Sequence, residues 1–167
     1  MYRRIDDFLQ DYENLTKGTL QIIGELTDEI LDQPVADGHR TLGQIAWHIA
    51  TTVPEMMSRT GLAISSIDQG SPPPKSASEI AAAYKTASEE LYEALEARWS
   101  DKTLIQTDDM YGEEWLRGAT LTVLIHHEVH HRGQMTVLLR QAGHKVPGVM
   151  GPAKEEWAHF GMAAPPY

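Results

Sequence analysis

The chain has 167 residues, a formal charge of −10 at pH 7 and no cysteine. These values exclude a disulfide framework and a thiolate metal site, and the negative charge disfavours nucleic acid as a partner. The acidic start lacks the apolar run of a signal peptide, and no apolar stretch approaches the ~20 residues of a membrane span. We therefore expect a cytoplasmic protein with one domain over residues 1–167, no membrane contact, and a Pro- and Gly-rich tail from about residue 143.

The first half of the chain shows apolar residues at three- and four-residue steps, which predicts amphipathic helices. The first helix is expected over residues 5–26, followed by one short turn before Pro34. A second helix should begin after Thr41, which forms a capping box with Gln44, and run to about Thr60. Pro54 lies inside this second helix and is expected to kink it or end it early.

The second half continues the helical pattern with one interruption. A third helix is expected from Ser76, which forms a second capping box with Glu79, to about Trp99. The pattern weakens over residues 100–114, which are expected to be extended or a loop. A fourth helix should span residues 117–142, and the tail has room for one short helix near residues 155–160. Four long helices with one buried stripe each predict an all-α four-helix bundle.

Four of the eight histidines lie close together in the fourth helix, at positions 126, 127, 130 and 131. Each residue advances about 100° around a helix axis, so the apolar residues of this segment define its core direction. His131 lies on that direction and His127 about 40° from it, whereas His126 and His130 lie on the flank. The inward pair has i, i+4 spacing, which places two imidazoles on one face, and a divalent metal is the simplest way to satisfy both.

Two further metal patterns overlap this segment. The letters HEVHH fit the HExxH pattern of zinc proteases, with Glu128 as the base, but no substrate-binding sheet precedes it. A solvated helix face or a flanking salt bridge is the preferred interpretation of Glu128. The ExxH pattern of di-iron proteins occurs at Glu128–His131 and again at Glu156–His159, but the second copy lies in the broken tail rather than on a long helix.

A pair of histidines is an incomplete metal site, so a third ligand is needed. The remaining histidines are His39, His48, His144 and His159. His48 lies at the border of the apolar stripe of the second helix, and its helical phase alone does not decide between a ligand and a half-exposed surface residue. Glu55, one helical repeat beyond His48, is the one acid expected near the site.

The segments TLGQIAWHIA (41–50) and HHEVHHRGQMTVLLRQAGHKVPGVMGP (126–152) resemble the DinB family, also called DinB/YfiT-like proteins. The resemblance implies a four-helix bundle with long crossover connections. It also implies one metal ion, nickel or zinc first and iron or manganese next, held by His48, His127 and His131. Homodimers are common in the family, so a homodimer is expected.

The resemblance also bears on function, because some family members transfer or isomerise substrates with a low-molecular-weight thiol. Three histidine ligands leave an open coordination position, which is typical of catalytic metals. We expect a metal-dependent enzyme acting on a small molecule, either a thiol S-transferase or a hydrolase. The alternative is a non-catalytic metal-binding stress-response bundle, and an HExxH zinc protease is the least favoured hypothesis.

Overall fold

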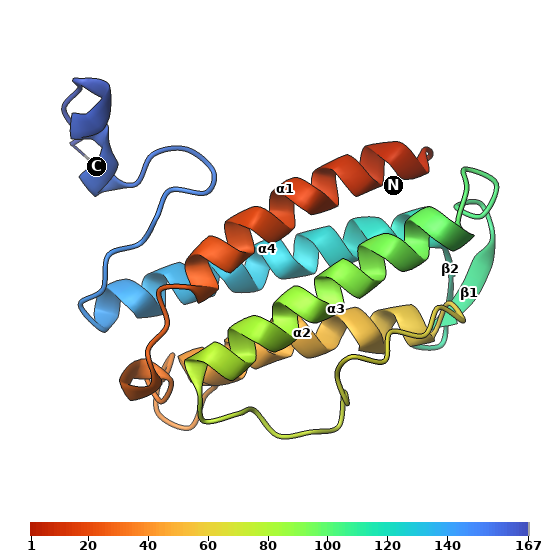
Figure 1. Cartoon of the computed structure of the whole chain (residues 1–167), viewed down its shortest axis with the longest axis horizontal. Helices are drawn as coiled ribbons and strands as arrows, with labels where there is room; N and C mark the ends of the chain where they lie inside the picture. The colour runs from red at the N-terminus through yellow and green to blue at the C-terminus, as the bar shows by residue number, and fades with distance from the viewer. Residues whose placement is uncertain (167) are drawn as a thin grey trace.

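A computed structural model of the chain describes residues 1–166, and these are mostly helical with one small two-stranded sheet (Figure 1). In chain order the elements are α1 (Ile5–Ile23), η1 (Asp28–Ile30), α2 (Leu42–Ser58), α3 (Ala77–Arg98), β1 (Thr107–Met110), β2 (Glu113–Leu116), α4 (Arg117–Gln141) and η2 (Lys154–Phe160). None of the described helices is both long and apolar enough to cross a membrane.

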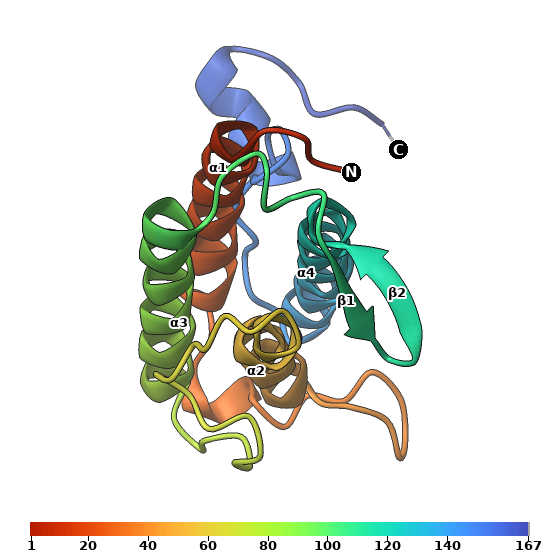
Figure 2. The same ribbon diagram turned by 90° about the vertical axis from the view of Figure 1, so that its right-hand side faces the viewer.

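The four long helices lie side by side, and each of α1 and α2 packs against both α3 and α4 (Figure 2). In Figure 1, α2 and α3 run in the same direction, whereas α1 and α4 run in the opposite one. Because α2 and α3 are parallel, the chain between them must run back along the full length of a helix, and residues 59–76 form this connection. The histidine-bearing helices α2 and α4 are therefore antiparallel neighbours.

The core lies between these helices and consists of apolar side chains from all four. Phe8, Ile22, Ile45, Met57, Ile80, Leu91, Leu95, Leu121 and Met135 are among its fully buried members. Each helix contributes one apolar stripe, as its sequence period predicts, because burying that stripe is the main stabilising contribution to such a fold.

The start of α2 agrees with its sequence signal. Thr41 Oγ1 accepts a hydrogen bond from the Gln44 amide, and the Gln44 side chain accepts one from the Thr41 amide. The helix continues beyond Pro54 to Ser58, so the expectation of an early end is wrong. In α3, by contrast, Ser76 makes no side-chain cap, and Asp28 Oδ1 accepts from the Ala77 amide at 2.7 Å.

The segment expected to be extended or a loop is a hairpin. Strands β1 and β2 are antiparallel, with Thr107 opposite Leu116 and Met110 opposite Glu113. Tyr111 and Gly112 both have positive φ, at 62° and 89°, as a two-residue hairpin turn requires. The hairpin lies beside α4, and β2 leads directly into that helix (Figure 2).

The tail after α4 runs back along α1, and its short helix η2 stands apart from the other helices (Figures 1 and 2). Val149 packs closely against Gly18, since a Cβ added to Gly18 would lie 3.3 Å from the Cβ of Val149. Arg140 holds η2 through a pair of hydrogen bonds to Glu155, the shorter at 2.7 Å. Both views place η2 on the α1 side of the molecule, away from α2.

Candidate metal centre

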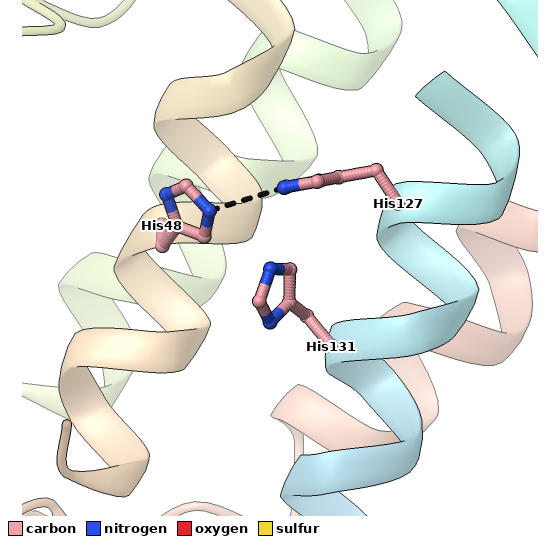
Figure 3. Close-up of side chains that lie close together, drawn as sticks. All are labelled: His48, His127 and His131. Atoms are coloured by element: carbon pink, nitrogen blue, oxygen red, sulfur yellow. Dashed lines mark hydrogen bonds between the residues drawn. The ribbon is translucent and has the colours of Figure 1, made fainter. Parts of the chain in front are cut away.

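His48 lies in the middle of α2, on the side that faces α4 (Figure 3). The residues around it, Trp47 and Ile49, are buried and fix the rotation of the helix about its axis. The hydroxyl of Thr52, one turn further on, donates to the His48 carbonyl at 2.7 Å. The imidazole is therefore carried by a helix whose position is set by its buried neighbours.

His127 and His131 lie one turn apart on α4 and both point toward α2 (Figure 3). Their ring centroids are 4.5 Å apart, and each lies within 5 Å of the His48 ring, at 4.9 Å and 4.7 Å. His127 and His131 thus point inward as expected, toward His48 on the antiparallel helix α2. His126 and His130, expected on the flank, are exposed.

The three imidazoles bring one nitrogen each to a common point, with all three atoms within 4.8 Å of one another. The Nε2 atoms of His48 and His127 are 3.1 Å apart. Two imidazole nitrogens that share a zinc ion at about 2.0–2.1 Å lie about 2.9 Å apart at an octahedral angle and about 3.4 Å at a tetrahedral one. The observed separation falls between these values.

The tautomer of His131 is set by its neighbour Gln134. Gln134 Oε1 lies 2.7 Å from His131 Nδ1, and an amide oxygen can only accept, so Nδ1 carries the proton. Nε2 is then the bare nitrogen available as a ligand, and a hydrogen bond to the other ring nitrogen is the usual way in which proteins orient a metal-binding histidine. Sequence reasoning missed this contact of Gln134 with His131, although the i+3 spacing of the two residues is a visible signal.

The environment keeps the imidazoles neutral. Burial lowers the pKa of His48 and of His127 to about 4, and the positive charge of Arg40 adds to this effect on both. Burial also lowers the pKa of His131, and its hydrogen bond to Gln134 opposes that shift. Neutral imidazole is the form that binds metals, so near pH 7 the three side chains are in the ligand form without first losing a proton.

Three neutral imidazoles that face one another can all bind a divalent cation, but they cannot all be satisfied by hydrogen bonds to one another. One proton can serve the contact between the Nε2 atoms of His48 and His127. Nε2 of His131, whose Nδ1 is bonded to Gln134, then faces this pair with no hydrogen-bond partner among residues 1–166. A metal ion accepts an electron pair from all three nitrogens at once. In residues 1–166, this is the one group of three histidine or acidic side chains whose ligand atoms converge in this way.

The chain is similar to known proteins along almost its whole length. The sequence profile of the DinB family matches residues 1–165. The uncharacterized protein YrdA of Bacillus subtilis (strain 168) is 43% identical over 165 residues, which cover 99% of each chain.

The chain belongs to the DinB family.

Two solved structures of DinB-like proteins extend the comparison. One, from Bacillus cereus ATCC 10987, is 44% identical, has a TM-score of 0.85, and is matched over 89% of this chain and 99% of its own. The other, YjoA of Bacillus subtilis, is 17% identical with a TM-score of 0.69, over 86% of this chain and 97% of its own. At that lower identity the likeness shows that the DinB fold is shared.

Within this DinB fold, Glu128 contradicts the expectation of a solvated face or flanking salt bridge. Its side chain is only 2% exposed and is therefore buried in the core. Oε1 accepts hydrogen bonds from Thr19 of α1 at 2.7 Å and from Tyr84 of α3 at 2.5 Å. A glutamate is usually assigned to the surface because its charge is costly to bury. Here two hydroxyls from distant parts of the chain and the neighbouring Arg132 stabilise the buried carboxyl of Glu128.

The position of Glu128 also decides against the zinc-protease pattern. A zinc protease needs this glutamate as a base beside the metal, but here its carboxyl binds α1 and α3 while His127 and His131 face α2. The third histidine of the cluster comes from α2 and not from a downstream position. Burial raises the pKa of Glu128, which is consistent with a structural group in the core.

The remaining expectations around the centre have mixed outcomes. The charge of Glu55 acts on both His48 and His127, so this acid does lie near the cluster, bonded to Arg59 and Tyr111. A Cβ at Gly133, in the middle of α4, would meet nothing within 4 Å, so this glycine does not serve a close approach between helices.

Proposed function

We propose that this DinB-family chain binds one divalent transition metal ion through His48, His127 and His131. Nickel or zinc is the preferred ion, followed by iron or manganese. The proposal depends on one observation, the convergence of three neutral imidazoles from two antiparallel helices. Imidazole nitrogen favours these metals over magnesium or calcium, which prefer oxygen ligands. The supporting framework would be a single four-helix bundle with long crossover connections.

The chain's own residues would prepare the centre before the ion arrives. His127 and His131 share one rigid helix, so their relative position is fixed by the helical repeat. Gln134 orients His131 through its Nδ1 proton, and the buried environment keeps His48 and His127 unprotonated. Ligands held in place in this way lose little conformational freedom on binding, which favours tight binding of the ion.

We propose further that the centre is catalytic. Three protein ligands leave at least one coordination position for a small molecule. When bound, the ion would supply Lewis acidity and lower the pKa of a coordinated water or thiol. Because the chain has no cysteine, any thiol must come as a cosubstrate. The reaction proposed is therefore thiol S-transfer to an electrophile, or hydrolysis, with a non-catalytic metal-binding role as the alternative.

An absorption titration of the cobalt- or nickel-loaded protein distinguishes these functions. Addition of 2-mercaptoethanol should shift the absorption bands, because a thiol that reaches the metal binds as a thiolate. The same titration on His127→Ala should show no shift. A response to azide without any response to thiols would favour hydrolysis over thiol transfer. Silence toward both, with the metal stoichiometrically bound, would overturn the catalytic proposal and favour the non-catalytic role.

A further inference from the structure

Two buried polar residues directly follow the two inward histidines of α4 in the chain. Glu128 follows His127 and is 2% exposed. Arg132 follows His131 and is 4% exposed. Successive residues point about 100° apart around a helix, so this second pair faces a different direction from the histidines. The histidines face α2 (Figure 3), whereas Glu128 and Arg132 form hydrogen bonds with α1, and Glu128 also with α3.

Thr19 of α1 is bonded to both members of this polar pair. Its buried hydroxyl donates to Glu128 Oε1 at 2.7 Å and accepts from Arg132 Nη1 at 3.3 Å. Arg132 Nη1 also donates to the Leu15 carbonyl of the same helix at 3.2 Å. One hydroxyl thus connects α1 to the residues beside both histidines of α4, although the histidine cluster itself is formed by α2 and α4.

Gly18 provides the space in which Arg132 reaches α1. A Cβ added to Gly18 would lie 3.1 Å from Arg132 Nη1, which is closer than ordinary van der Waals contact. A larger residue at this position would push the guanidinium away from the Leu15 carbonyl and the Thr19 hydroxyl. Gly18 and Thr19 together therefore form the surface of α1 on which the Arg132 side chain lies.

Burial of apolar side chains does not by itself fix the rotation of α4 about its axis. Val123, Val129 and Val137 of this helix are exposed, while its Glu128 and Arg132 are buried. A helix held only by hydrophobic burial would turn its valines inward and its charged groups outward. The hydrogen bonds to Thr19 oppose that rotation, because buried charged groups are costly to leave without partners.

We propose that Thr19 is a positioning residue for the three-histidine centre. Through Glu128 and Arg132 it fixes the rotation of α4 that directs both inward histidines of this helix at α2. The inference rests on the proposed function, since it concerns the ligands of the proposed metal ion. A rotation of about 10° moves a side-chain tip that lies about 5–6 Å from the helix axis by about 1 Å. Metal–ligand distances tolerate deviations of only about 0.2 Å, so a small rotation is enough to weaken metal binding.

Thr19→Val tests this role, because valine keeps the shape of threonine and lacks the hydroxyl. Zinc affinity is measured by competition with a chromophoric chelator, under conditions in which urea unfolding shows each variant to be folded. We expect Thr19→Val to bind zinc about tenfold more weakly, as when a hydrogen-bonding partner behind a metal ligand is lost. The absorption bands of the cobalt-loaded variant should also shift, because the angles between the three nitrogens change. Thr19→Ser keeps the hydroxyl and should retain the affinity and the spectrum of the unaltered chain.

Two further substitutions on α1 separate positioning from stability. Ile22→Val is the matched control, because it deletes one buried methyl group from the next turn of the same helix. It should lower the urea midpoint and leave the zinc affinity and the cobalt spectrum unchanged, since a less stable protein that is still folded presents the same ligands. Gly18→Ala should weaken zinc binding about threefold, because the added Cβ displaces Arg132.

The outcomes distinguish the positioning role from the function on which it rests. An unaltered chain that binds no zinc would overturn both. If the unaltered chain binds zinc, a folded Thr19→Val variant with the same affinity and spectrum would overturn the positioning role and leave the metal centre standing. An equal loss of affinity in Ile22→Val would assign the effect to stability and overturn the role as well. Should Thr19→Val not fold, Gly18→Ala decides in its place, and unchanged zinc binding in that variant would overturn the role.

Discussion

Removal of the Tyr84 hydroxyl tests whether the buried Glu128 carboxyl stabilises the fold. Tyr84 is fully buried, and its hydroxyl donates to Glu128 Oε1 at 2.5 Å. Tyr84→Phe keeps the packed ring and deletes that donor, leaving Thr19 as the remaining hydrogen-bond donor to the carboxyl. A buried hydrogen bond to a charged group contributes about 1.5–3 kcal/mol, so we expect a loss of that size in the free energy of unfolding.

The assay is urea unfolding of the metal-free protein, with the slope against urea expected to stay constant. In a chain of this size the expected loss corresponds to a fall of about 3–12 °C in melting temperature. Tyr92→Phe is the matched control, because it deletes the same atom from a partly buried tyrosine of the same helix, whose hydroxyl makes no hydrogen bond within residues 1–166. A Tyr84→Phe loss within about 0.5 kcal/mol of the Tyr92→Phe value would refute the reasoning.

Three further predictions concern packing and charge. Gly133→Ala should stabilise the protein by about 0.5–1 kcal/mol in urea unfolding, because the added Cβ meets open space and alanine favours a helix; a loss would contradict this. Gly118→Ala should cost about 1–3 kcal/mol in the same assay, because its Cβ would lie 2.2 Å from the Tyr2 carbonyl oxygen; an unchanged midpoint would argue against that close approach. In metal-free protein, NMR should show His48 and His127 titrating with a pKa of about 4, below the 6.5 of an unfolded chain. The unfolded chain then binds more protons between these values, so both side chains make the fold lose stability as the pH falls from 6.5 to 4; midpoints near 6.5 would contradict the burial argument.

Structural features that depend only on residues within one helix could be predicted from the sequence. The capping box at Thr41 and Gln44 involves residues three apart, and it forms as expected. The inward direction of His127 and His131 follows from the helical repeat, and the structure places both beside His48. The phase of His48 alone was indecisive, since a border position becomes informative only when the neighbouring helix is known.

Features that depend on distant segments could not be predicted in this way. Ser76 and Glu79 have the letters of a capping box, but Asp28, 49 residues from Ala77, provides the cap of α3 instead. Glu128 was assigned to the surface because its buried partners, Thr19 and Tyr84, lie 109 and 44 residues away.

The hairpin could not be predicted from the sequence because an uncommon residue occupies its turn. Tyr111 adopts a φ of 62°, a conformation that glycine or asparagine usually occupies. Its neighbour Gly112 carries the ordinary signal of such a turn, but one glycine did not distinguish a hairpin from a loop. The hydrogen bond from Tyr111 to Glu55 and its contact with Arg59 hold this turn against α2, and both partners are more than 50 residues away in the chain.

The measurement that tests the proposed metal centre most directly is the metal content of the protein purified without chelators. We expect one nickel or zinc ion per chain in the unaltered protein and none in His131→Ala. His126→Ala and His130→Ala are matched controls, because they remove exposed histidines from the same turns of α4, and both should keep the full metal content. Loss of metal from these two variants, together with its retention in His131→Ala, would contradict the assignment of the centre to His48, His127 and His131.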